Sequence, residues 1–182
     1  APLIVYSSLT SSVYTVSLFA KAVERQYLSL FDNGGSAANA MFNLSGNGTV
    51  VSESTAGIAT ITPYPNGWYR ITMRTPTLTN MNVQFRLSTD GTTTSYAGTL
   101  NSGVYIWGAQ LNIGSTAKPY FPTTDRLNVP RLTYQNGGGG CPSLLLEKQS
   151  TNLVTYSEQF DNVNWSKVST TVTPNATTAP NG

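Results

Sequence analysis

Histidine is absent from this 182-residue chain, and cysteine occurs once, as Cys141. Without histidine, the chain lacks the usual general base near neutral pH and the commonest ligand of transition metals. Catalytic Ser–His and Cys–His pairs are therefore excluded within it. A single cysteine cannot form a disulfide within one chain.

Charge and long apolar runs are also scarce. Only 10 % of residues are charged, against roughly 25 % in an average globular domain. The net charge is +2 and the basic residues are scattered, so we expect no nucleic-acid partner. No apolar run approaches the roughly 18 residues of a membrane span, so we expect no membrane insertion. The apolar N-terminal residues follow no basic region, which argues against a signal peptide.

Serine, threonine, asparagine and glycine take the place of charges. A surface of hydroxyls and amides is typical of secreted or virion β-proteins, and it suits contact with the hydroxyls of sugars. The same composition also describes an ordinary β-protein surface without any ligand.

Short alternating runs separated by Gly, Pro, Asn and Asp recur along the chain. No segment has a convincing 3.6-residue period over ten or more residues. This pattern predicts an all-β fold, an antiparallel β-sandwich of the jelly-roll type. The expected strands are 13–22, 27–31, 40–44, 49–52, 58–62, 68–74, 83–87 and 103–111, with a further candidate at 169–173.

The run 103–111 gives the clearest strand signal. Its alternation predicts one face made of Tyr105, Trp107, Ala109 and Leu111, and another made of Val104, Ile106 and Gln110. Pro119 and Pro122 then end the strand, because proline cannot donate to a sheet.

Composition changes near residue 125. Four consecutive glycines precede Cys141, and such a run is too flexible for the middle of a packed element. We therefore predict a sandwich over 1–125, a Gly-rich linker over 126–142, and a second unit over 143–182.

Several strings resemble one known family. Residues 142–167 (PSLLLEKQSTNLVTYSEQFDNVNWSK) are similar to the opening of a module common in phage tail-fibre and virion-appendage proteins. Residues 13–22, 66–70 and 104–111 resemble the middle and end of that module. Its members are concanavalin A-like (laminin G-like) jelly rolls, often described as carbohydrate-binding.

The order of the segments is permuted relative to this family, because the opening strands follow the middle and end. Residues 143–182 either complete the sandwich of their own chain or insert into a neighbouring chain, building a head-to-tail assembly. A sandwich without them would expose strand edges, so we expect 143–182 not to be a free tail.

The resemblance implies a virion or extracellular protein without enzymatic activity that binds host surface carbohydrate and self-associates, as a homotrimer or head to tail. The alternative is a purely structural virion decoration or filament-forming protein, assembled by strand exchange between subunits.

Five residues are candidates for carbohydrate binding. Trp68, Tyr69 and Trp165 carry rings on which sugars can stack, although rings in such strands often pack in the core instead. Arg70 and Arg74 share a strand face and could hold the carboxylate of an acidic glycan. The alternative for both arginines is solvation or a local ion pair.

No catalytic or metal site is predicted. Eight carboxylates occur, but no spacing marks the facing pair that a glycoside hydrolase needs. Asp32-Asn33 and nearby carbonyls could bind calcium, but no calcium-loop motif accompanies these residues, so an Asx turn is the favoured interpretation. No cofactor is expected.

Overall fold

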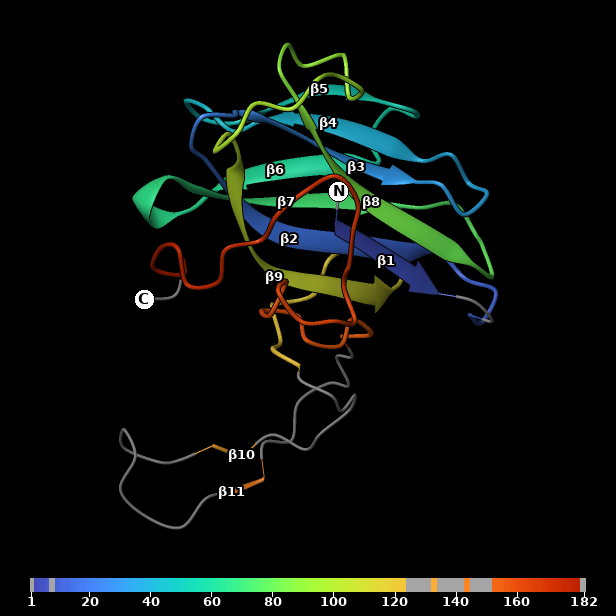
Figure 1. Ribbon diagram of the computed structural model, residues 1–182. Coiled ribbons are helices and arrows are strands. Elements are labelled where there is room, and N and C mark those ends of the chain that lie inside the picture. Colours follow the sequence, from blue (N-terminus) through green and yellow to red (C-terminus); the bar gives the residue numbers. More distant parts are fainter. Residues whose placement is uncertain (1, 7–8, 124–131, 134–142, 145–151, 181–182) are drawn as a thin grey trace.

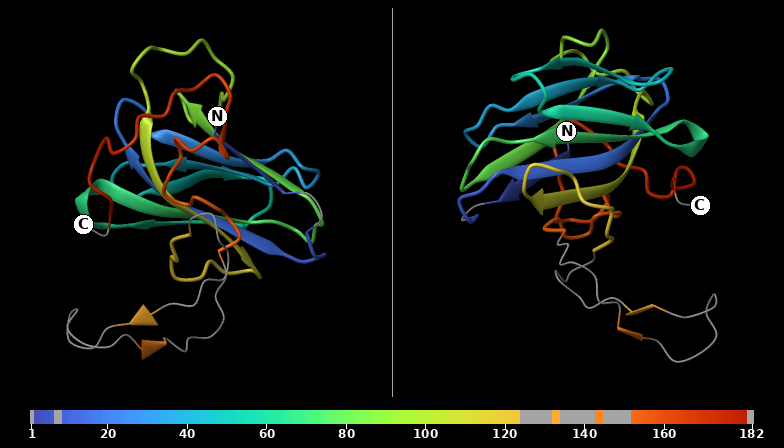
Figure 2. Two further views of the ribbon diagram at one scale, coloured as in Figure 1. Left: turned by 60° about the horizontal axis from the view of Figure 1, so that its bottom comes forward. Right: turned by 180° about the vertical axis from the view of Figure 1, so that it is seen from behind.

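The protein is an antiparallel β-sandwich, seen here in a computed structural model that describes residues 2–6, 9–123, 132–133, 143–144 and 152–180. Two sheets pack face to face, and the described residues contain no α-helix (Figures 1 and 2). The predicted all-β sandwich is confirmed. Its assignment as a jelly roll with permuted segments stays a prediction.

The larger sheet has six strands in the order β12-β1-β8-β3-β4-β5. Their bounds are β1 (Pro2–Tyr6), β3 (Tyr27–Asp32), β4 (Asn39–Asn43), β5 (Thr49–Glu53), β8 (Met81–Ser88) and β12 (Ser166–Lys167). The smaller sheet has the order β6-β7-β2-β9. Its strands are β6 (Ala59–Pro63), β7 (Trp68–Arg74), β2 (Tyr14–Ala22) and β9 (Val104–Ile113).

Two small elements complete the description. A short 3₁₀ turn, η1 (Pro65–Gly67), joins β6 to β7. Among the described residues, the strands β10 (Leu132–Thr133) and β11 (Ser143–Leu144) pair with each other and with no other strand. The rest of the predicted linker 126–142 lies outside the described residues.

Two strand expectations differ from the structure. The N-terminal β1 was not predicted; it pairs with β8 and with β12. The predicted strand at 169–173 is wrong, because these residues form no strand and the C-terminal segment pairs through Ser166–Lys167 instead. Threonine-rich composition fits a pleated surface, but a strand also needs a free sheet edge beside it.

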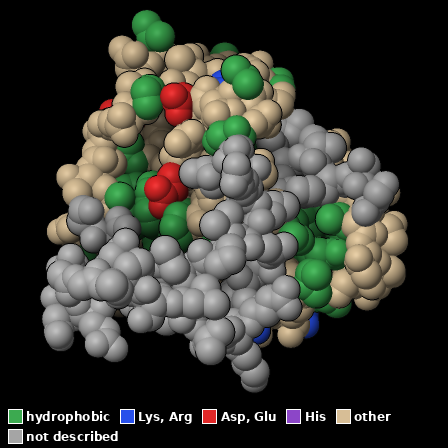
Figure 3. Space-filling model, turned by 90° about the horizontal axis from the view of Figure 1, so that it is seen from below, with side chains coloured by type: hydrophobic (Ala, Val, Ile, Leu, Met, Phe, Trp, Pro, Cys, Tyr) green, Lys and Arg blue, Asp and Glu red, His purple; other side chains and the backbone are tan. Residues whose placement is uncertain are grey.

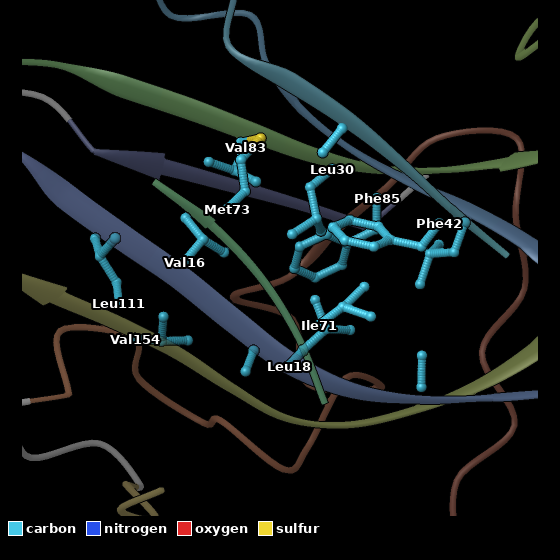
Figure 4. Packing of buried hydrophobic residues seen from close by; sticks show 14 of the residues in the cluster. Val16, Leu18, Leu30, Phe42, Ile71, Met73, Val83, Phe85, Leu111 and Val154 are labelled. Carbon is cyan, nitrogen blue, oxygen red and sulfur yellow. The ribbon is translucent and has the colours of Figure 1, made fainter. Parts of the chain in front are cut away.

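The core lies between the two sheets. Alternate residues of β2, including Val16 and Leu18, point inward and are fully buried, as the alternation of 13–22 predicts. They face Val83 and Phe85 from β8, with Leu30 and Phe42 beside them, as Figure 4 shows.

The alternation predicted for β9 is wrong in its second half. Gly108 has a left-handed backbone with φ of 63°, and the pairing register with β2 shifts at this point. Such a β-bulge adds one residue and reverses the phase of the side chains. Trp107 therefore lies beside Phe19 on the outer face, whereas Leu111 lies beside Val16 in the core.

The segment 152–157 lies along the free edge of β9. Leu153 N–H donates to the carbonyl of Leu111, and Ala109 N–H donates to that of Ser157. The Asn152 side chain, 1 % exposed, accepts from Leu111 N–H and Val154 N–H. Its amide group donates to two carbonyls, those of Ala109 and Phe121. A sheet edge that would otherwise be open is thereby paired.

Further along, Phe160 and Trp165 enter the core. Their ring centroids lie 4.6 Å apart, and both rings contact Phe85 of β8. In this single chain, residues 152–165 thus belong to the same core as 9–123.

Candidate functional site

A large hollow opens at one end of the sandwich. It has a volume of about 1800 Å³ and lies where β2 ends and β9 begins. Two long segments, 94–103 and 158–177, form much of its wall. Figure 2 shows the C-terminal segment crossing this part of the molecule. Figure 3 shows hydrophobic and acidic side chains together in a recess of the face that is seen from below.

The wall of this end hollow combines rings with neutral polar groups. Its exposed or half-buried rings are Tyr96, Tyr105 and Trp107. Serine and threonine side chains surround them: Thr94, Ser95, Thr99, Ser102, Ser169, Thr170, Thr171, Thr173 and Thr177. Rings offer flat apolar faces and hydroxyls offer both donors and acceptors, which together match the surface of a sugar.

Charged groups in the end hollow are few and partly engaged. The Arg25 guanidinium lies 5.6 Å from the centroid of the Tyr96 ring and donates to Thr99 Oγ1 at 3.1 Å. Glu24 accepts from Gly103 N–H at 3.1 Å. These contacts tie the 94–103 segment to the end of β2.

Trp68, one of the predicted site residues, belongs to the wall of the end hollow but not as a stacking surface. Its side chain is 2 % exposed, so its faces are covered by protein. Its indole Nε1–H has no acceptor among the described residues. Because an unpaired buried donor is costly, this N–H is a candidate donor to a bound oxygen at the hollow.

Tyr69 and Trp165 lie elsewhere, in the core. Tyr69 is 6 % exposed and its hydroxyl donates to the carbonyl of Gly46 at 2.7 Å. Trp165 is 4 % exposed and its indole N–H donates to the carbonyl of Tyr156 at 3.0 Å. Neither ring presents a face to solvent in this conformation, so both residues support the fold.

Arg70 lies on the outer face of the smaller sheet and is not among the residues that line the end hollow. Its guanidinium lies 5.7 Å from the Phe19 ring centroid and donates to the carbonyl of Lys118 and to Ser17 Oγ. Burial lowers the pKa of this guanidinium, and the nearby Tyr64 hydroxyl opposes that shift. Its contacts fasten the exit segment after β9 onto the sheet.

Around Arg70 an aromatic cluster covers that outer face. The Phe19 ring contacts Tyr64 at 5.0 Å, Trp107 at 5.3 Å and Tyr120 at 5.9 Å between centroids. The Tyr120 hydroxyl bonds with Ser157 Oγ and Glu158, and burial raises the pKa of this phenol. The cluster therefore packs the exit segment, and only its rim, including Tyr64 at 39 % exposure, meets solvent.

Arg74, the fifth predicted residue, lines a separate and smaller hollow at the other end of β7. The five predicted residues therefore do not form one site. Tyr96 and Tyr105, which line the end hollow, were not predicted. Tyr105 lies in a predicted strand, but its partners across the hollow come from loops without a sequence pattern.

The possible calcium position is occupied by the fold itself. Asp32 Oδ1 accepts from Gly34 N–H and Asn82 N–H, each at 2.9 Å, and Ser36 Oγ donates to Oδ2. The bond to Gly34 is that of an Asx turn. Within the described ranges, no group of three His, Cys, Asp or Glu side chains is arranged to hold a metal ion.

No helix in the described part of the chain has the length and apolarity of a membrane span. No family model matches this chain, and no significant match is found among curated proteins.

Proposed function

We propose that this chain is a non-enzymatic module of a virion appendage or tail fibre and that it binds host surface carbohydrate in the end hollow. The composition of the wall carries this proposal. Three exposed or half-buried rings stand among nine serine and threonine side chains, and Trp68, with its unpaired N–H, lines the same hollow. Such a wall suits a neutral, hydroxyl-rich ligand better than an apolar cofactor or a nucleic acid.

The size of the hollow favours an oligosaccharide. Small-molecule sites typically measure ~300–1000 Å³, and this one is larger. Several sugar rings could therefore lie along it. Individual contacts of this type are weak, and self-association of the chain would raise the affinity for a repetitive surface polymer.

The experiment is binding to immobilised bacterial capsular and lipopolysaccharide O-chain polysaccharides. Tyr96→Ala and Tyr105→Ala each remove a ring from the hollow, so we expect both to reduce retention. Tyr64→Ala is the matched control, because it removes an exposed ring outside the hollow. Equal loss in all three variants, or no retention of the unaltered chain on any of these polymers, would contradict the proposal.

The tryptophan indole resonances supply a second readout on the polysaccharide that is retained. The N–H of Trp68 lacks an acceptor, whereas that of Trp165 already donates to Tyr156. On adding oligosaccharide fragments of that polymer, we expect the Trp68 indole signal to move and the Trp165 signal to stay. The reverse pattern would place the ligand elsewhere.

A purely structural role is the second candidate. The observation that favours it is the C-terminal segment, which supplies Asn152, Phe160 and Trp165 to the sandwich from beyond a glycine-rich stretch. The same contacts between two chains would exchange strands and build a filament. Light scattering over a range of concentrations separates the candidates: assemblies that lengthen with concentration and bind no polysaccharide favour the structural role.

A further inference from the structure

A second hollow, of about 370 Å³, opens at the opposite end of the sandwich. Val13, next to the start of β2, lines it, whereas Val23, next to the end of β2, lines the end hollow. The nine residues of β2 span about 30 Å at ~3.3 Å per residue. The two hollows are therefore separate sites, each formed by different loops.

The lining of this second hollow contains one charged residue, Arg74, and no carboxylate. The remaining polar side chains all carry hydroxyls: Ser36, Ser54, Thr55, Thr75 and Thr77. Donor groups thus surround a single positive charge. This differs from the end hollow, where Glu24, Glu158 and Asp161 share the wall with Arg25 and Arg86.

The hydroxyls of the second hollow divide into two groups. Those of Ser36, Ser54 and Thr75 bond within the fold: to Asp32, to Asn39 N–H and to the Tyr14 backbone, respectively. Thr55 and Thr77 make no side-chain hydrogen bond among the described residues, and both are exposed. Arg74 likewise has no hydrogen-bond or ion-pair partner for its guanidinium there. Three donor side chains are therefore available to a ligand. Arg74 ends β7, and Thr55 and Thr77 lie on loops that the neighbouring Ser54 and Thr75 fasten to the fold.

The acidic groups near this end do not compensate Arg74. Both oxygens of Glu53 accept backbone N–H groups, from Gly57 at 2.6 Å and Ala59 at 3.0 Å. These bonds, led by that from Gly57, lower the pKa of Glu53. Asp32 is fully buried, and its Oδ1 accepts hydrogen bonds from the N–H groups of Gly34 in its own turn and of Asn82 in β8. Both carboxylates are thus committed to backbone donors, and the guanidinium stays free.

We propose that the second hollow is an oxyanion site, in which Arg74 pairs with a carboxylate, sulfate or phosphate group and the hydroxyls of Thr55 and Thr77 donate to it. Guanidinium binds such planar or tetrahedral oxyanions through two parallel N–H bonds. The volume accommodates one charged sugar ring rather than a polymer segment. This site does not depend on carbohydrate binding in the end hollow.

The test is an NMR titration of the intact chain, following the Arg74 Nε–Hε signal and the Thr55 and Thr77 amides. The probes are sodium glucuronate, glucose 6-sulfate and glucose 6-phosphate, with glucose as the uncharged control and ionic strength held constant. We expect saturable shifts with at least one charged sugar and none with glucose. Which of the charged probes binds shows whether the site takes a carboxylate, a sulfate or a phosphate group.

Arg74→Gln should lower the affinity for the probe that binds by roughly tenfold or more, and a tenfold change corresponds to ~1.4 kcal/mol. Arg25→Gln is the matched control, because Arg25 lines the end hollow, and it should leave the affinity unchanged. The titration of the unaltered chain stands even if Arg74→Gln does not fold. Shifts that fail to saturate, equal shifts with glucose, or equal weakening by Arg25→Gln would overturn the proposal.

Discussion

Replacing Gly108 with alanine should destabilise the sandwich through two separate effects at the β9 bulge. The first is conformational, because Gly108 has φ of 63°. A left-handed backbone costs an L-residue ~1–2 kcal/mol. The second is steric, because a Cβ at this position would lie 3.2 Å from ring atoms of both Phe19 and Tyr120.

Neither ring can withdraw easily. Tyr120 is held by hydrogen bonds to Ser157 Oγ at 2.9 Å and Glu158 Oε1 at 3.0 Å. Phe19 is enclosed by the other rings of the aromatic cluster. Overpacking of such a site costs ~1–3 kcal/mol. The two costs sum to a predicted loss of about 2–5 kcal/mol for Gly108→Ala.

Gly46→Ala is the matched control. Gly46 has nearly the same φ, 59°, but nothing lies within 4 Å of its added Cβ. Gly46→Ala should therefore lower the free energy of unfolding only through the conformational effect. We expect a loss of about 1 kcal/mol once the reduced entropy of the unfolded chain is included. Guanidinium unfolding followed by tryptophan fluorescence measures both variants. If Gly108→Ala loses no more stability than Gly46→Ala, the crowding argument fails, and with it the bulge geometry.

Three further substitutions test the contacts that shape the fold. Asn152→Asp keeps the shape but replaces two buried donors with a negative charge against two carbonyls, so unfolding experiments should show a loss of ~2–5 kcal/mol; a change within experimental error would mean that 152–157 does not hold the β9 edge. Gly34→Ala would place a Cβ 2.6 Å from the backbone nitrogen of Asn82 and should cost ~1–3 kcal/mol, whereas Gly98→Ala, with open space around it, should be neutral. Hydrogen bonds, led by that from Thr93 N–H, lower the pKa of Asp90 below its ordinary value, so its stabilising contribution is complete above about pH 4 and lost as the pH falls. Asp90→Asn should therefore flatten the acid-side decline of the unfolding midpoint, and an unchanged pH profile would refute this role.

Most strands could be predicted from the sequence, because a period of two is a local property of the chain. The runs 13–22 and 68–74 alternate cleanly and correspond to β2 and β7. Residues 169–173 show the limit of this reasoning. Their composition favours a strand, but composition does not show which residues pair with a sheet, and the C-terminal segment pairs with β1 through Ser166–Lys167.

The bulge in β9 was not predicted, because one glycine inside an alternating run is compatible with an uninterrupted strand. Gly108 was the available signal, since glycine within a strand often marks a bulge. The consequence is large. A phase reversal moves Ala109 and Leu111 into the core and leaves Tyr105 and Trp107 outside it, which supplies two rings of the end hollow.

The candidate sites were less predictable, because they depend on which loops meet at each end of the sandwich. Residue type alone singled out Trp68 and Arg74 as candidates for carbohydrate binding, but it could not show where each would lie. β7 instead carries Trp68 at its start and Arg74 at its end, so a single strand delivers them to opposite ends of the molecule. Trp68 then lines a hollow with rings and hydroxyls, and Arg74 lines one whose other polar side chains all carry hydroxyls. A ligand that engaged both would have to extend over about 20 Å along β7, so two ligand groups of different charge fit this architecture better than one.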